Sequence, residues 1–322
     1  MQEPARKGVT RLIAGYAAIA FILPYLALKI AWISGAPVGM PNQSLVADPS
    51  MLALNLLTFF MDAVAILLAL TFTHSWGLRA PGWPLLFPMW VGTGFLAPIA
   101  VATPIITVVG MLGLDSGQRP SSGTGAGEQA LVEPWVFEVV YTSFVGQGLA
   151  LMTAFILYVR ARWDGLLRKP IADGQPPRPA IRLVGNAASV VAATVGLLHL
   201  FWAAGAPLGL PPRLLHSRGA NFYLLHAIFG LAALGAATGI VMLVNRLGRR
   251  PLWLPLSLAW TGSGAMFSWG AWLLLATVLR FSRDADSWLL TANNVIKTGA
   301  GLLIGALIGL LVTTSARASS QR

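Results

Sequence analysis

The sequence of 322 residues contains no cysteine and few charged residues, which make up 10% of the chain. The absence of cysteine excludes a disulfide scaffold, cysteine-ligated metal clusters and thiol catalysis. Soluble domains contain about 25% charged residues, so the low charge excludes a soluble globular protein. Acidic residues are fewer than basic ones: the chain has 11 Asp and Glu against 22 Lys and Arg, so it is strongly basic.

Long hydrophobic runs take the place of the missing charge. Hydrophobic residues make up 56% of the chain, and the mean hydropathy is +0.70. A helix needs about 20 apolar residues to cross the roughly 30 Å of bilayer hydrocarbon, and a barrel strand needs only about ten. The runs therefore predict an all-α, polytopic integral membrane protein with eight transmembrane helices, near residues 12–34, 51–73, 85–113, 134–158, 181–205, 220–244, 252–279 and 288–313.

The basic residues predict the orientation of these helices. Lys and Arg are retained on the cytoplasmic side of an inserting chain. With the N-terminus inside, 15 of the 22 basic residues fall on the cytoplasmic side, five fall outside, and Lys29 and Lys297 lie within spans. We therefore expect both termini in the cytoplasm of a bacterium, with the protein in its inner (plasma) membrane. The basic residues then report topology and form no patch for nucleic acid.

Two halves of the sequence resemble each other. The segment LKIAWISGAPVGMP at 28–41 returns as LHLFWAAGAPLGLP at 198–211, an offset of 170 that is identical at seven of 14 positions. Residues around the third span of each half match at the same offset, among them Trp90 and Gly94 with Trp260 and Gly264. In the fourth span the offset is 153, and the change falls in a Gly- and Ser-rich loop at 115–133, interpreted as a flexible insertion.

An even number of spans gives both halves the same orientation, which predicts two parallel four-helix repeats related by an axis along the membrane normal. The repeats are expected at 1–160 and 182–322, joined by a cytoplasmic linker at 161–181. An alternative is that the matching Trp and Gly residues serve only to anchor and pack helices.

The segment from Leu198 to Gly209, with His199, Trp202 and Gly205, resembles a bacterial family of small four-helix membrane proteins of unknown function. The first half departs from that pattern by having Lys29 in the place of His199. The resemblance implies that the chain is a fused pair of such units, and it implies no activity.

Ionisable residues inside spans are costly and are therefore functional candidates. They lie in the outer half or near the midplane of their spans, which indicates a polar pocket that opens outward at the repeat interface. Helical spacing adds neighbours on the same faces. The predicted substrate-binding residues are Lys29, Trp32, Asp62, Glu138, Tyr141, His199, Trp202, His226, Asn294 and Lys297.

Charge matching predicts Lys29 with Asp62 and Lys297 with Glu138 as pairs. The alternative is a set of structural ion pairs or side chains that snorkel to the interface. His199 and His226 are expected at similar depth, where two imidazoles are able to ligate haem iron or another metal. A lysine in the last helix is also the feature that forms the Schiff base of retinal proteins. The residues do not identify a cofactor.

Three functions fit these features. The leading hypothesis is that the protein binds or transports a small solute or a lipid. The second is a membrane-embedded enzyme in which Asp62, Glu138 or a histidine acts as general acid or base. The third is a non-catalytic partner subunit. The expected partners are the bilayer and a small-molecule or lipid ligand; the sequence does not set the oligomeric state or a direction of transport.

Overall fold

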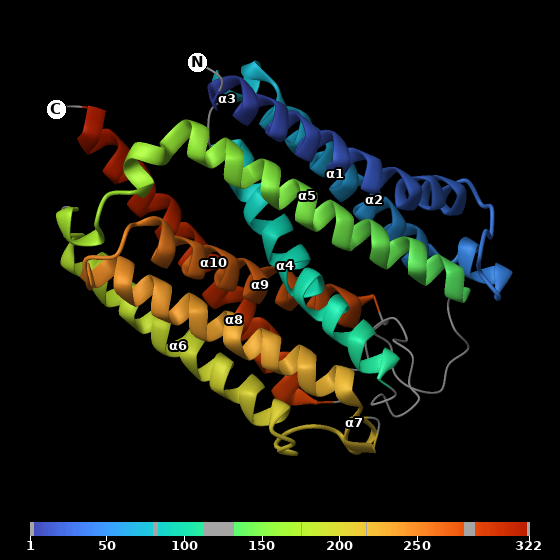
Figure 1. The fold of residues 1–322 in the computed structure, drawn as a ribbon. Coiled ribbons are helices and arrows are strands. Elements are labelled where there is room, and N and C mark those ends of the chain that lie inside the picture. Colours follow the sequence, from blue (N-terminus) through green and yellow to red (C-terminus); the bar gives the residue numbers. More distant parts are fainter. Residues whose placement is uncertain are drawn as a thin grey trace. The chain divides into compact units, whose positions relative to one another are not determined.

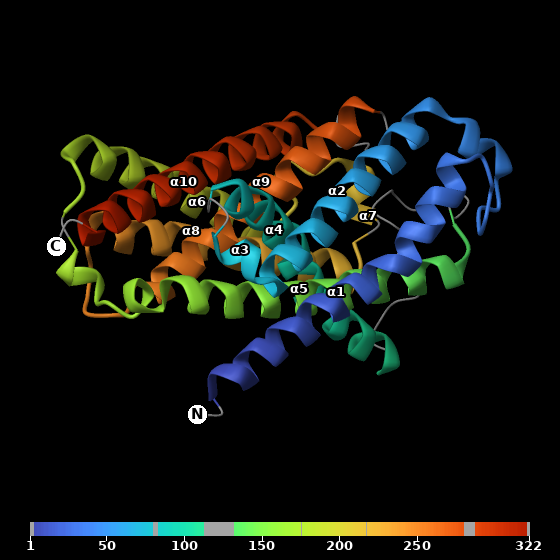
Figure 2. The ribbon, with the colours of Figure 1, turned by 90° about the horizontal axis from the view of Figure 1, so that it is seen from above.

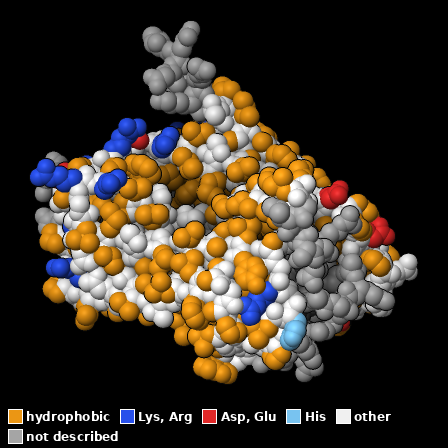
Figure 3. Space-filling model, turned by 60° about the horizontal axis from the view of Figure 1, so that its bottom comes forward, with side chains coloured by type: hydrophobic (Ala, Val, Ile, Leu, Met, Phe, Trp, Pro, Cys, Tyr) orange, Lys and Arg blue, Asp and Glu red, His pale blue; other side chains and the backbone are white. Residues whose placement is uncertain are grey.

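In the computed structural model of the chain, residues 3–79, 83–112, 132–174, 176–216, 218–279 and 287–320 are described. These residues form helices joined by loops, without a strand among them (Figure 1). Seven of the helices are long and apolar enough to cross a membrane. Hydrophobic side chains are also spread widely over the face in Figure 3. The protein is therefore an all-α, multi-pass membrane protein, as predicted.

By its packing, the chain divides into two units, Met1–Met89 with Ser121–Arg162, and Trp90–Pro120 with Trp163–Arg322. The division falls within α4 and near the end of α5. Each unit is therefore described by itself. The predicted loop insertion lies almost entirely outside the described residues, as do the basic residues Arg119, Arg280 and Arg283.

The first unit contains α1, α2, α3 and most of α5, with bounds Glu3–Ile33, Pro49–Thr73, Ser75–Arg79 and Pro134–Leu167, and the short 3-10 helix η1, Gln43–Ala47. The side chain of Asp48 caps the N-terminus of α2. It accepts hydrogen bonds from the backbone N–H groups of Ser50 and Met51, at 2.8 and 3.1 Å. These donors have no partner inside the helix, so the carboxylate fixes where α2 starts. Pro49 at the first helical position is compatible with this start.

The second unit contains α4 from Trp90 onward together with α6, α8, α9 and α10. The bounds are Trp83–Met111 for α4, Pro179–Ala203 for α6, Ala220–Asn245 for α8, Trp253–Val278 for α9 and Trp288–Ser320 for α10, with short helices η2, Ile171–Asp173, and α7, Pro212–His216. Helices α6, α8, α9 and α10 run side by side, each packed against the next (Figures 1 and 2).

Small residues let these helices approach closely. Lipid tails are as apolar as the side chains, so helices in a membrane associate through van der Waals contact rather than through the hydrophobic effect. A Cβ atom on Gly262 would lie 2.1 Å from the carbonyl oxygen of Ala232, and one on Gly239 would lie 2.5 Å from the backbone nitrogen of Ala259. The buried core of this unit accordingly contains many alanines, among them Ala192 and Ala236.

Helix α6 has one exposed face and one face that packs against the other helices. Leu183, Val190 and Leu197 are more than 60% exposed and repeat every seven residues along one face. Ala192, His199 and Trp202 are buried on the opposite face. The exposed stripe suits contact with lipid, so the polar His199 points into the helix bundle.

Candidate functional site

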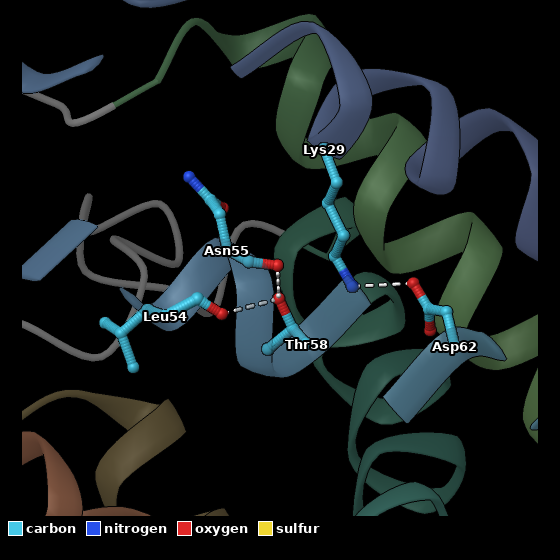
Figure 4. Close-up of polar contacts among 5 residues, drawn as sticks. All are labelled: Lys29, Leu54, Asn55, Thr58 and Asp62. Atoms are coloured by element: carbon cyan, nitrogen blue, oxygen red, sulfur yellow. Dashed lines mark hydrogen bonds and ion pairs between the residues drawn. The ribbon is translucent and has the colours of Figure 1, made fainter. Parts of the chain in front are cut away.

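A buried ion pair joins α1 to α2 in the first unit. The Lys29 Nζ atom donates to Asp62 Oδ2 at 2.6 Å, and both residues are less than 5% exposed (Figure 4). This is the pairing that charge matching predicts. Lys29 does not snorkel, because its side chain reaches from α1 across to α2, where the ammonium group meets the Asp62 carboxylate (Figure 4).

Side-chain direction explains how these two residues meet. Counted at about 1.5 Å per residue from the helix ends that the α1–α2 loop joins, Lys29 is expected at a depth of about 7 Å and Asp62 at about 15 Å. Side chains on a helix lean toward its N-terminus. Since α1 and α2 run in opposite directions, Lys29 leans away from the loop that joins them and Asp62 leans toward that loop. The long lysine side chain spans the remaining gap.

Aromatic side chains lie on the lysine side of the pair. Lys29 Nζ lies 3.9 Å from the centroid of the Tyr25 ring, a cation–π distance. Tyr25 in turn contacts Trp32 and Phe144 edge to face, at centroid distances of 6.4 and 5.2 Å. Asn55 is buried on the same face of α2 as Asp62, but its amide points away from the pair (Figure 4). The charges are thus held in a buried site with aromatic side chains beside the lysine.

The loops that follow α1 and α6 have the same local structure. Trp32 Nε1 donates to the carbonyl oxygen of Val38 at 2.8 Å, and Trp202 Nε1 donates to that of Leu208 at 2.8 Å. Gly35 and Gly39 have positive φ angles of 91° and 65°, and Gly205 and Gly209 have 93° and 66°. These conformations favour glycine, which explains why the motif keeps it at both places. The segment repeated in sequence is therefore also repeated in local structure.

A second polar cluster lies in the second unit, where His199 of α6 contacts two other helices. His226 Nδ1 of α8 lies 3.0 Å from His199 Nδ1, and Asn293 Nδ2 of α10 lies 3.2 Å from His199 Nε2. An amide nitrogen only donates, so Nε2 of His199 is an acceptor and its Nδ1 carries the proton. His199 therefore donates to His226. The Asn293 oxygen is buried and has no hydrogen-bond partner.

Lys297 of α10 lies beside this cluster and is 4% exposed. Its Nζ atom is 5.7 Å from the centroid of the Phe229 ring. A cavity of about 10 Å³ separates Lys297 and His199 from apolar side chains of α6, α8 and α9, room for about one water molecule. Asn294, one residue from Asn293, is also buried.

Two predicted site residues are placed differently. Glu138 is exposed, and Tyr141, half-buried, stacks on Phe137 with the ring centroids 6.4 Å apart. The buried face of α5 is instead formed by residues such as Ser143 and Gln147. Glu138 and Lys297 belong to different units, so their pairing stays a prediction.

Sequence reasoning left out several residues that the structure brings to these clusters. Tyr25 lies four residues before Lys29, a spacing that places both on one face of α1. Asn293 and Phe229 complete the second cluster, and helical spacing alone does not choose between Asn293 and Asn294. The Nδ1 contact between the histidines depends on the packing of α6 against α8, which spacing within one helix does not predict.

The geometry of the histidines does not fit haem ligation. Two axial nitrogens on opposite faces of an iron would lie about 4 Å apart, with the macrocycle between them. His199 and His226 are in direct hydrogen-bond contact, and the adjoining cavity has a volume of only about 10 Å³. This volume has no room for a retinal chromophore either. Within the described part of the chain, no group of three or more His, Asp or Glu side chains is positioned to hold a metal ion.

These features define a class: a multi-pass, α-helical membrane protein with ionisable side chains buried in its apolar helices. No protein-family model, curated protein or solved structure matches the chain significantly.

Proposed function

We propose that the protein is a plasma-membrane transporter of a small polar solute, built from two parallel four-helix repeats with both termini in the cytoplasm. The observation that carries the proposal is that each half has a buried polar cluster built on the same position of its first long helix. Residue 29 and residue 199, separated by the repeat offset, each bind a polar side chain on the following long helix of their own half. Ionisable groups buried at such depth typically mark a pathway for ions or substrate.

Contacts between α4 and α9 support the parallel repeat. These are the third spans of the two halves, and Gly94 packs directly against its repeat equivalent Gly264, with an added Cβ on Gly94 2.2 Å from the Gly264 backbone. Residue numbers increase together along the contact, from Trp90 with Ser263 to Phe95 with Trp272, so the helices run in the same direction. An inverted repeat would make them antiparallel. Equivalent residues meet where a twofold axis passes between two copies.

Helix α9, seventh in chain order, completes the eight spans of this proposal. It has 26 residues and no charged side chain, and Gly, Ser, Thr and Trp lower its hydropathy below that of the other long helices. Because α9 packs against α8 and α10, its surface is covered largely by protein. A helix that contacts protein rather than lipid over most of its surface can contain more polar and small residues, which explains its lower hydropathy.

The charged ends of each unit support the orientation. In the second unit, Arg182 at the start of α6 donates to Asn245 at the end of α8 at 3.5 Å, and the linker binds the α8–α9 loop through the Ile171 N–H and the Arg250 carbonyl at 3.0 Å. In the first unit, Arg11 donates to the carbonyl of Thr73. Basic residues thus gather at the end of each unit that the proposal places in the cytoplasm.

The test is a thermal-stability screen of the purified, full-length protein against small carboxylates, phosphates, amines and phospholipid headgroups. A transporter should be stabilised by a solute that it then accumulates in proteoliposomes, because a ligand that binds the folded state raises its stability. Recovery of a chemically altered compound would favour the enzyme. Copurification of a partner protein with no stabilising solute would favour the subunit.

A further inference from the structure

We infer that the coupling ion of the proposed transporter is the proton, carried by a hydrogen-bonded chain of Asn293, His199 and His226. This inference rests on the proposed function, which it deepens. Nitrogen atoms dominate the chain, and imidazole nitrogens bind protons, whereas sodium and other hard cations require several oxygen ligands. The membrane helices of the second unit contain no Asp or Glu to supply such oxygens.

The three side chains come from three helices and form one continuous chain. Asn293 of α10 donates to His199 Nε2, and His199 Nδ1–H donates to His226 Nδ1, over 3.2 and 3.0 Å. In this state the proton of His226 is on Nε2. Both histidines are neutral, because each ring uses one nitrogen as an acceptor, Nε2 in His199 and Nδ1 in His226.

The buried Asn293 oxygen is the feature that a purely structural chain does not explain. It has no hydrogen-bond partner, and an unsatisfied buried acceptor costs about 1–3 kcal/mol. Rotation of the amide by half a turn would present this oxygen to His199 Nε2. The oxygen then becomes the acceptor of a second state in which His199 carries its proton on Nε2.

One proton crosses the chain as it changes from the first state to the second. As the amide rotates, the incoming proton binds His199 Nε2, and His199 releases its Nδ1 proton to His226 Nδ1. His226 then loses its Nε2 proton on the far side. Each ring gains one proton and gives one up. The product has His226 Nδ1–H donating to His199 Nδ1, and His199 Nε2–H donating to the Asn293 oxygen.

The charged and titratable groups on the surrounding helices are few. Lys297 of α10 lines the same cavity as His199. Neither α9 nor the described part of α4 in this unit contains an ionisable side chain. On α6, Arg182 lies 17 residues before His199, and on α8, Tyr223 lies three residues before His226 and is 38% exposed. No carboxylate on these helices therefore competes for the transferred proton.

Histidine-selective ¹⁵N NMR on the full-length protein in nanodiscs tests the chain directly, since the protein has four histidines. We expect one ring with its proton on Nδ1, and scalar coupling between the Nδ1 atoms of two rings. His226→Gln should abolish that coupling. Two rings that both carry their proton on Nε2, with no coupling, would overturn the inference.

Proteoliposomes with trapped pyranine and an imposed potassium diffusion potential test the function of the chain. Wild-type protein should conduct protons, and His199→Gln, His226→Gln and Asn293→Leu should each lower the flux at least tenfold. His216→Gln is the matched control, because His216 is exposed and bonds only to the backbone oxygen of Pro212 in its own short helix. Its flux should equal that of the wild type.

The outcomes separate this inference from the proposed function. Solute accumulation without proton flux, or proton flux that survives all three substitutions in folded protein, overturns the proton chain and leaves the transporter in place. Proton flux that needs the three residues, in a protein that accumulates no solute from the screen, supports the chain and counts against the solute transporter. Asn293→Asp, which restores an acceptor, should retain more flux than Asn293→Leu.

Discussion

At the scale of single residues, the most informative feature is that buried charge in a membrane helix must be compensated. Lys29 and Asp62 lie on separate helices, and neither position predicts the other by spacing. Both are rare residue types for a span, and their opposite charges suffice to predict the pair. The neighbouring Tyr25 was not predicted, because aromatic residues are common in membrane helices and carry no comparable signal.

Removing one member of this pair should destabilise the protein strongly. Lys29→Met leaves Asp62 buried without its cation, and Asp62→Asn leaves Lys29 without its anion, at a cost of about 3–5 kcal/mol each. The double variant Lys29→Met with Asp62→Leu should recover much of that loss. Thermal unfolding in detergent measures the three variants. Glu138→Gln, at an exposed position, is the control and should change stability by less than about 0.5 kcal/mol.

Single losses below about 1 kcal/mol would mean that water reaches the charges, which is the result that an open pathway through this site requires. In that case, solute accumulation should fall more than stability in both single variants. Loss of stability and activity in equal proportion would make the pair structural.

The two loop tryptophans should behave alike. Trp32→Phe and Trp202→Phe each remove one N–H···O bond to a loop carbonyl and keep most of the ring contacts, so each should cost about 1 kcal/mol. Hydrogen–deuterium exchange of the loops after α1 and α6 should increase in the matching variant. A difference of more than about 2 kcal/mol between the two variants would contradict equivalent roles for the loops.

At the scale of helices, the hydrophobic runs predict the long helices closely. The run at 220–244 corresponds to α8 at Ala220–Asn245, and the run at 51–73 to α2 at Pro49–Thr73. The run at 134–158 ends before α5 does, because a more polar stretch continues the helix to a kink at Trp163 and then to Leu167. Short helices such as α3 and α7 have no periodic signal of their own and were not predicted.

Close packing of α4 against α9 predicts a sharp difference between two neighbouring glycines. Gly94→Ala would place a Cβ 2.2 Å from the Gly264 backbone, whereas a Cβ on Gly92 meets nothing within 4 Å. Alanine favours helix by about 1 kcal/mol over glycine, so Gly92→Ala should be neutral or stabilising. Gly94→Ala should cost about 1–3 kcal/mol through overpacking, measured by thermal unfolding. Equal effects at the two positions would exclude this helix contact.

At the scale of the whole molecule, the sequence repeat and the packing units differ. The sequence divides the chain near residues 161–181, whereas packing assigns α4 from Trp90 onward to the same unit as α6, α8, α9 and α10. A repeat offset records which residues correspond, and it does not say which helices contact each other. The repeat offset predicts that Gly94 corresponds to Gly264, but only the three-dimensional structure shows that these two residues are in contact.

Membrane orientation is the broadest prediction, and single cysteines test it because the chain has none of its own. Ser44 in η1 and Leu208 in the loop after α6 are exposed, Ser44 at the end of its unit opposite to Arg11 and Leu208 at the end opposite to Arg182. Ala172 is exposed in η2, beside the basic end of α8 and α9. An impermeant maleimide applied to intact cells should therefore label Ser44→Cys and Leu208→Cys but not Ala172→Cys, which should react only after the membrane is opened.

Labelling of Ala172→Cys alone in intact cells would reverse the orientation. Labelling of only one of the two outer positions would show that the halves enter the membrane in opposite directions, and the parallel repeat would then be wrong.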